Sequence, residues 1–145
     1  MSNNNSDISV DRIQILIVDD DTEVRNVIKN YLIHFGFNYF LEAKDGSEAY
    51  RYVLDMRQRI DLIISDWEMP KTDGLTLLKA VRRHHNRSHT PFIMVTSQQS
   101  QERMKITNAK LAEVTGYIVK PFRAEVLKEK VWMALNLAGL KSEAG

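Results

Sequence analysis

The sequence contains no cysteine, and this absence excludes disulfides, thiol nucleophiles and thiolate metal sites. Its longest apolar runs fall far short of the roughly 20 residues that a membrane-spanning helix needs. The first ten residues also lack the basic and apolar regions of a signal peptide. We therefore expect a chain that does not enter a membrane and that works in the cytoplasm.

Neither sign of charge is in excess, because 20 Lys and Arg residues balance 19 Asp and Glu residues. No strong overall field exists to attract nucleic acid or anionic lipid, so we expect neither as a partner. The 145 residues are 43% hydrophobic and 27% charged, which is typical of one globular domain with its own core. We expect a flexible tail over residues 1–11, one domain over 12–140 and a short C-terminal tail over 141–145.

Short apolar segments alternate with segments of helical spacing along the whole chain. The expected strands are 13–18, 39–43, 62–65, 92–95 and 116–119. The expected helices are a first one capped by Asp20 or Asp21 and ended by Gly36, then 47–56, 75–84, 99–112 and 125–138. Right-handed crossovers between such strands give a doubly wound α/β fold: an open parallel sheet with helices on both faces.

Four of these strands end on residues that carry chemistry. Asp19 and Asp20 follow the first strand, Asp66 follows the third, Thr96 the fourth and Lys120 the fifth. The carboxyl ends of parallel strands meet at one edge of a sheet, where such folds bind their ligands. These side chains are therefore expected to form one site.

The predicted site has more negative than positive charge. Two unit charges about 4 Å apart interact by roughly 4 kcal/mol at an effective dielectric of 20, so the carboxylates favour a divalent cation. Hard oxygen ligands favour Mg²⁺ over Zn²⁺. We predict Asp20 and Asp66 as direct ligands, with Asp19 nearby or acting through a water molecule. The alternative for Asp19 and Asp20 is simple capping of the first helix.

A metal ion, an ammonium group and a hydroxyl around a carboxylate suit phosphoryl transfer. We predict that Asp66 is the nucleophile that becomes an aspartyl phosphate, while Lys120 holds the transferred oxygens. Thr96 is predicted to donate a hydrogen bond to the phosphoryl group and, by moving inward, to couple modification to a surface change. Tyr117 is a candidate reporter of that change, with ordinary core packing as the alternative.

Five stretches of the sequence resemble the receiver domain of two-component response regulators, above all its chemotaxis members. They are residues 16–20, 35–38, 64–70, 73–75 and 116–122, and the likeness extends over roughly 13–140. The resemblance implies a flavodoxin-like (βα)5 fold with strand order 2-1-3-4-5. It also implies that Asp19, Asp20, Asp66 and the backbone carbonyl of Glu68 hold Mg²⁺, and that the bond before Pro121 is cis.

The same resemblance implies a function. Asp66 would accept a phosphoryl group from a histidine kinase, and the domain would then bind a downstream partner, expected to be a flagellar motor switch protein. Such a domain is a phospho-accepting signalling switch that catalyses its own phosphorylation and dephosphorylation, and a phosphatase is a further expected partner. It is not an enzyme with a separate substrate. The protein is thus expected to be a single-domain response regulator in chemotaxis.

Three other functions are compatible with these residues. A phosphorelay intermediate would pass its phosphoryl group on to a second protein. A receiver fragment of a larger regulator would continue beyond Gly145. A phosphatase of the haloacid dehalogenase type would use an Asp-x-Asp nucleophile after the first strand, a spacing that Asp19 and Asp21 provide.

Overall fold

The computed structural model describes residues 10–69, 72–99 and 114–137 of the chain. A single parallel sheet contains β1 (Gln14–Val18), β2 (Tyr39–Ala43), β3 (Leu62–Asp66), β4 (Phe92–Thr96) and β5 (Gly116–Val119). Its strands lie in the order β2-β1-β3-β4-β5, and every neighbouring pair is parallel. The five strands and the order implied by the resemblance are thus confirmed.

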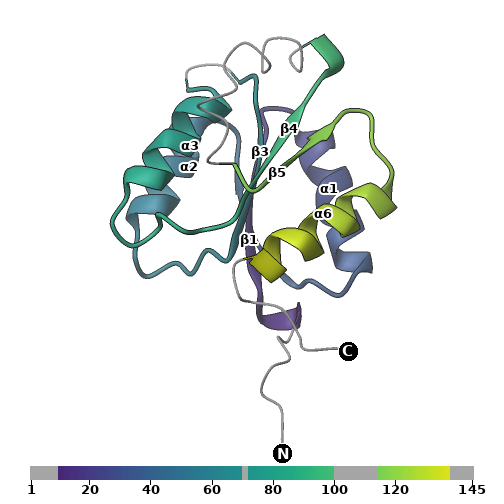
Figure 1. Cartoon of the computed structure of the whole chain (residues 1–145), viewed down its shortest axis with the longest axis horizontal. Coiled ribbons are helices and arrows are strands. Elements are labelled where there is room, and N and C mark those ends of the chain that lie inside the picture. The colour runs from purple at the N-terminus through teal and green to yellow at the C-terminus, as the bar shows by residue number, and fades with distance from the viewer. Residues whose placement is uncertain (1–9, 70–71, 100–113, 138–145) are drawn as a thin grey trace, which may run out of the picture.

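The described helices are α1 (Thr22–His34), α2 (Gly46–Leu54), α3 (Gly74–Arg83) and α6 (Ala124–Leu137). Helices α1 and α6 cover one face of the sheet, and α2 and α3 cover the other (Figure 1). The doubly wound α/β arrangement is therefore confirmed. The helix expected over 99–112 lies, apart from its first residue, outside the described residues. None of the helices described is long and apolar enough to cross a membrane.

The central strands are buried on both sides, which explains their uninterrupted apolar sequences. In β1, Ile15 and Ile17 face the layer of α1 and α6, whereas Leu16 and Val18 face the layer of α2 and α3. This alternation follows from the two-residue period of a strand. Each face thus has its own core, and the sheet lies between two helical layers.

An aspartate caps the N-terminus of each of three helices. Asp21, Asp45 and Asp73 cap α1, α2 and α3, and each carboxylate accepts a hydrogen bond of 2.8 or 2.9 Å from a backbone N–H of the first turn. Gly36 follows α1 with φ 104°, the left-handed conformation predicted for it. The predicted strands 39–43 and 116–119 have the observed bounds, and the other described elements differ from their predicted bounds by at most two residues.

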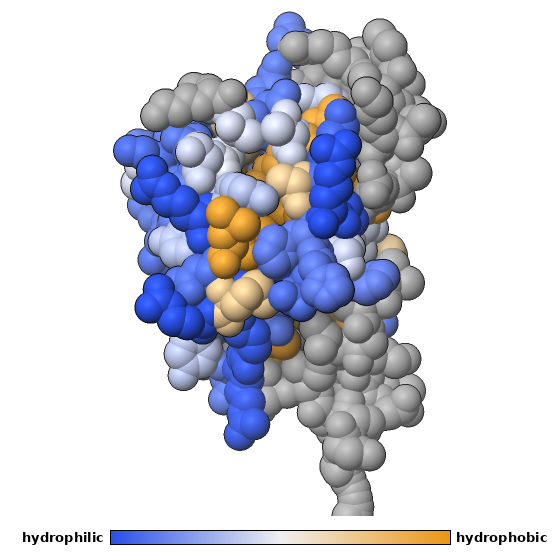
Figure 2. All heavy atoms as spheres, turned by 90° about the vertical axis from the view of Figure 1, so that its left-hand side faces the viewer, coloured by the Kyte–Doolittle hydropathy of each residue, from blue (hydrophilic) through white to orange (hydrophobic). Residues whose placement is uncertain are grey.

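Val10 and Asp11, two residues of the expected N-terminal tail, belong to a described element. Val10–Arg12 forms a 3-10 turn, and the partly buried Val10 packs against the core below α1 and α6. The remainder of the expected N-terminal tail, residues 1–9, and the expected C-terminal tail, 141–145, lie outside the described residues. Seen from the side of α2 and α3, the surface is mostly hydrophilic with a small apolar area (Figure 2), and Leu54 at the end of α2 is exposed.

Candidate functional site

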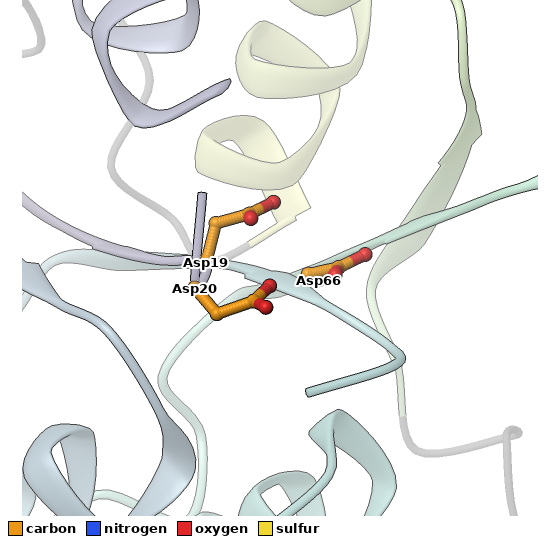
Figure 3. Close-up of side chains that lie close together, drawn as sticks. All are labelled: Asp19, Asp20 and Asp66. Carbon is orange, nitrogen blue, oxygen red and sulfur yellow. The ribbon is translucent and has the colours of Figure 1, made fainter. Parts of the chain in front are cut away.

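Three carboxylates meet where β1 and β3 end side by side. Asp19 and Asp20 directly follow β1, and Asp66 is the last residue of β3. One oxygen of each carboxylate lies within 4.8 Å of the others, and all three side chains extend toward the same region (Figure 3). Asp19 and Asp66 are buried, whereas Asp20 is exposed. The sheet therefore brings together the three acidic residues that the sequence singled out.

Lys120, which directly follows the edge strand β5, completes this cluster. Its Nζ lies 3.2 Å from Oδ1 of Asp66 and 3.9 Å from Oδ2 of Asp19. The backbone N–H of Lys120 donates a 2.7 Å hydrogen bond to the carbonyl of Thr96 and so joins the ends of β4 and β5. The bond between Lys120 and Pro121 is cis, as the resemblance implied.

Burial dominates the electrostatics of the two inner carboxylates. It raises the pKa of Asp19 from 3.8 to about 6, and the nearby negative charge of Asp66 adds to this effect. Burial also raises the pKa of Asp66, although Lys120 offsets part of the increase. One ammonium group thus does not compensate the negative charge that the fold concentrates here.

The cluster fits a small, hard dication. Oδ1 of Asp19 accepts a 2.9 Å hydrogen bond from the backbone N–H of Asp21. Its other oxygen, Oδ2, is buried and has no hydrogen-bond donor among the described residues. A buried oxygen without a donor is costly, and a cation next to it would remove that cost. The oxygen-only donor set is the one that Mg²⁺ prefers.

The two residues predicted to act in switching have different environments. Thr96 ends β4 with its side chain fully buried, and its hydroxyl donates a 3.2 Å hydrogen bond to the carbonyl of Ser97. Tyr117 lies on the edge strand β5 and is 46% exposed, so the core-packing alternative does not apply to it in this structure. Glu68 is exposed, two residues after Asp66, and its carbonyl remains a predicted ligand.

The structure adds a role for two residues to which the sequence assigned none, Gly74 and Arg25. Gly74, the first residue of α3, lies so close to the end of β3 that a Cβ there would collide with the carbonyl oxygen of Asp66. Arg25, in α1, donates a 2.6 Å hydrogen bond to the carbonyl of Asp19. The need for space at Gly74 leaves no pattern in the sequence, and neither does a single arginine among the polar residues of α1. Only the packed structure reveals either role.

This fold and this cluster of strand-end residues define a class of protein. The chain matches the model of the response regulator receiver domain over residues 15–132, and it belongs to that family, whose members are signalling switches. Among its relatives, chemotaxis protein CheY of Pseudomonas aeruginosa is 43% identical over 120 residues, which cover 81% of this chain and 92% of the relative. Chemotaxis protein CheY1 of Helicobacter pylori is 39% identical over 123 residues, covering 85% and 97%. The chain is a CheY-like receiver domain.

Solved structures agree with this assignment. The chemotaxis response regulator CheY4 of Vibrio cholerae superimposes with a TM-score of 0.74 at 33% identity, covering 85% of this chain and 98% of that one. A CheY-like receiver domain protein of Methanospirillum hungatei gives a TM-score of 0.75 at 27% identity, covering 87% and 95%. The family match supports a receiver domain and not a phosphatase of the haloacid dehalogenase type. The Asp-x-Asp spacing of that alternative is used differently here, since Asp21 caps α1.

Proposed function

We propose that this chain is a phosphorylation switch in which Asp66 accepts a phosphoryl group from a histidine kinase. The observation that supports this proposal is the 3.2 Å contact between Nζ of Lys120 and Oδ1 of Asp66 inside a cluster of three carboxylates. A structural ion pair would not need two further acidic groups beside it. A phosphoryl-transfer site needs them, because they hold the cation that neutralises the transferred group.

Each residue of the site has its own role in the proposed phosphoryl transfer. Asp66 attacks phosphorus with a carboxylate oxygen, and the bond between phosphorus and the donor's imidazole nitrogen breaks with its electron pair going to the imidazole. Lys120 contacts the oxygens of the transferred group and neutralises their charge. Asp19, Asp20, Asp66 and the carbonyl of Glu68 would hold Mg²⁺, which supplies further neutralisation when bound. Thr96 would then turn its hydroxyl from Ser97 to the new phosphoryl group, and Tyr117 would follow this change.

The output of the switch is proposed to be chemotaxis. The relatives named above are chemotaxis proteins, and this chain covers about nine-tenths or more of their lengths. A motor switch protein that binds the phosphorylated form is therefore the partner that we propose. A phosphorelay intermediate would instead be recognised by transfer of the label from Asp66 to a histidine of a second protein.

A mass measurement tests the chemistry directly. The protein is incubated with acetyl phosphate and Mg²⁺, and its intact mass is recorded before and after addition of a chelator. We expect the gain of one phosphoryl group in the wild type and no gain in Asp66→Asn. The matched control is Asp73→Asn, since Asp73 is another aspartate near the site that only caps α3, and asparagine caps equally well. Labelling of Asp66→Asn at the wild-type level would contradict the proposal.

A further inference from the structure

Arg25 lies one turn into α1 and contacts the carboxylate cluster through the backbone of Asp19. Its NH1 donates a 2.6 Å hydrogen bond to the backbone carbonyl of Asp19, and its NH2 donates a 3.2 Å bond to the hydroxyl of Thr22. Only 14% of its side chain is exposed. An arginine buried to this extent with a main-chain acceptor is fixed in place, in contrast to the usual solvated arginine of a helix surface.

The carbonyl that Arg25 holds belongs to the peptide unit between Asp19 and Asp20. The backbone N–H of Asp19 is also fixed, because it donates a 3.1 Å hydrogen bond to the carbonyl of Ala43 at the end of β2. The plane of the Asp19–Asp20 peptide sets the direction of the N–Cα bond of Asp20 and so restricts where its side chain can point. Asp20 is exposed and lies beyond the end of β1, so the pairing of the strands does not fix its position.

Glu42 on β2 holds the guanidinium group from the other side. Its Oε1 lies 3.1 Å from Nε of Arg25, and its Oε2 lies 3.1 Å from Nζ of Lys29. Lys29 thus shares the carboxylate of Glu42, but it is more exposed, at 35% of its side chain. The two cations share Glu42, but the hydrogen bond to Asp19 comes from Arg25. This difference makes Lys29 a useful control.

We propose that Arg25, anchored by Glu42, is a positioning residue that sets the Mg²⁺ affinity of the carboxylate cluster by fixing the Asp19–Asp20 peptide. The inference rests on the proposed function, because it takes Mg²⁺ as the ion bound. Residues behind the direct ligands of a metal commonly change its affinity about 10- to 100-fold when they are replaced. Arg25 would act on Asp20 in this way through the peptide whose carbonyl it binds.

The sign of the effect separates positioning from simple electrostatics. Arg25 carries a positive charge near a site for a dication, so its removal would strengthen Mg²⁺ binding if charge alone mattered. A positioning role predicts the opposite, since Asp20 loses its fixed direction and must be ordered when the ion binds. If removing the positive charge of Arg25 weakens Mg²⁺ binding, the loss of charge cannot be the cause.

The experiment measures Mg²⁺ dissociation constants by calorimetric titration of the unphosphorylated protein, with folding checked by circular dichroism. We expect Arg25→Gln and Arg25→Lys to bind Mg²⁺ about tenfold more weakly than the wild type, because neither side chain reproduces the arginine fork. Lys29→Gln is the matched control: it removes a cation from the same Glu42 without touching Asp19, and we expect less than about a twofold change. If Arg25→Gln does not fold, Arg25→Lys decides the question.

Three results would overturn the inference in recognisable ways. Unchanged or tighter Mg²⁺ binding by folded Arg25 variants would leave the proposed function intact and refute the positioning role. An equal loss of affinity in Lys29→Gln would attribute the effect to the ion-pair group as a whole. Failure of the wild type to bind Mg²⁺, together with no phosphorylation of Asp66, would refute the positioning role and the proposed function at once.

Discussion

Replacing Asp19 by asparagine should stabilise the metal-free protein. The side chain of Asp19 is only 2% exposed, and its pKa is raised from 3.8 to about 6, first by burial and then by the charge of Asp66. A tenfold change in proton affinity corresponds to about 1.4 kcal/mol, so ionised Asp19 costs the fold about 3 kcal/mol relative to the unfolded chain. Asparagine removes this charge and keeps an oxygen that can accept the hydrogen bond from the N–H of Asp21.

The effect should depend on pH with a defined sign. The folded protein binds a proton at Asp19 more tightly than the unfolded chain does. The resulting stabilisation is complete below about pH 4 and is lost as the pH rises through about 6. The advantage of Asp19→Asn should therefore be small near pH 4 and should approach 3 kcal/mol, as an upper bound, at about pH 8.

Urea unfolding followed by circular dichroism measures this difference. The experiment is run with a chelator at several pH values and then repeated with excess Mg²⁺. Because an ion that binds only the folded state stabilises it, Mg²⁺ should raise the stability of the wild type more than that of Asp19→Asn. Asp73→Asn is the control, with no expected change at either pH. A variant that is no more stable than the wild type near pH 8, or whose advantage is independent of pH, would refute the reasoning.

Three further substitutions test other contacts. Arg87→Met should lower the free energy of unfolding by about 2–4 kcal/mol, because the buried guanidinium donates to four backbone carbonyls at and after the end of α2; urea unfolding measures this loss. Gly74→Ala should cost about 1–3 kcal/mol and reduce the labelling of Asp66, because the added Cβ collides with the carbonyl of Asp66. Lys120→Met should slow labelling by acetyl phosphate about tenfold or more, measured as the rate of mass gain, since the pKa of Asp66 loses its main lowering influence.

Each of these predictions can be contradicted by a defined result, and one of them has a matched control variant. Gly116→Ala matches Gly74→Ala, because a Cβ at Gly116 meets no atom within 4 Å, and equal losses in both would show that the collision is not the cause. An Arg87→Met protein with wild-type stability would mean that water replaces the guanidinium without cost. Labelling of Lys120→Met at the wild-type rate would remove the ammonium group from the mechanism.

The sequence alone determined which segments form strands and which residues end them. Uninterrupted apolar runs such as 13–18 are readable because strands buried on both faces need apolar side chains at every position. Helix caps such as Asp21 and the left-handed Gly36 are equally local, since their causes lie within a few residues. The alignment of Asp19, Asp66 and Lys120 at one edge follows from these local facts and from the parallel direction of the strands.

Only the tertiary structure decided what fixes those residues in place. Lys120 approaches Asp19 to 3.9 Å from a distant part of the chain, and Arg25 reaches the carbonyl of Asp19 from a different element. The burial of Oδ2 of Asp19 without a hydrogen-bond donor among the described residues likewise results from packing. Such contacts depend on how helices pack against the sheet, a balance of many small energies that no local pattern encodes. The chemistry of the site was therefore readable from residue types at strand ends, whereas its geometry and its support were set by packing.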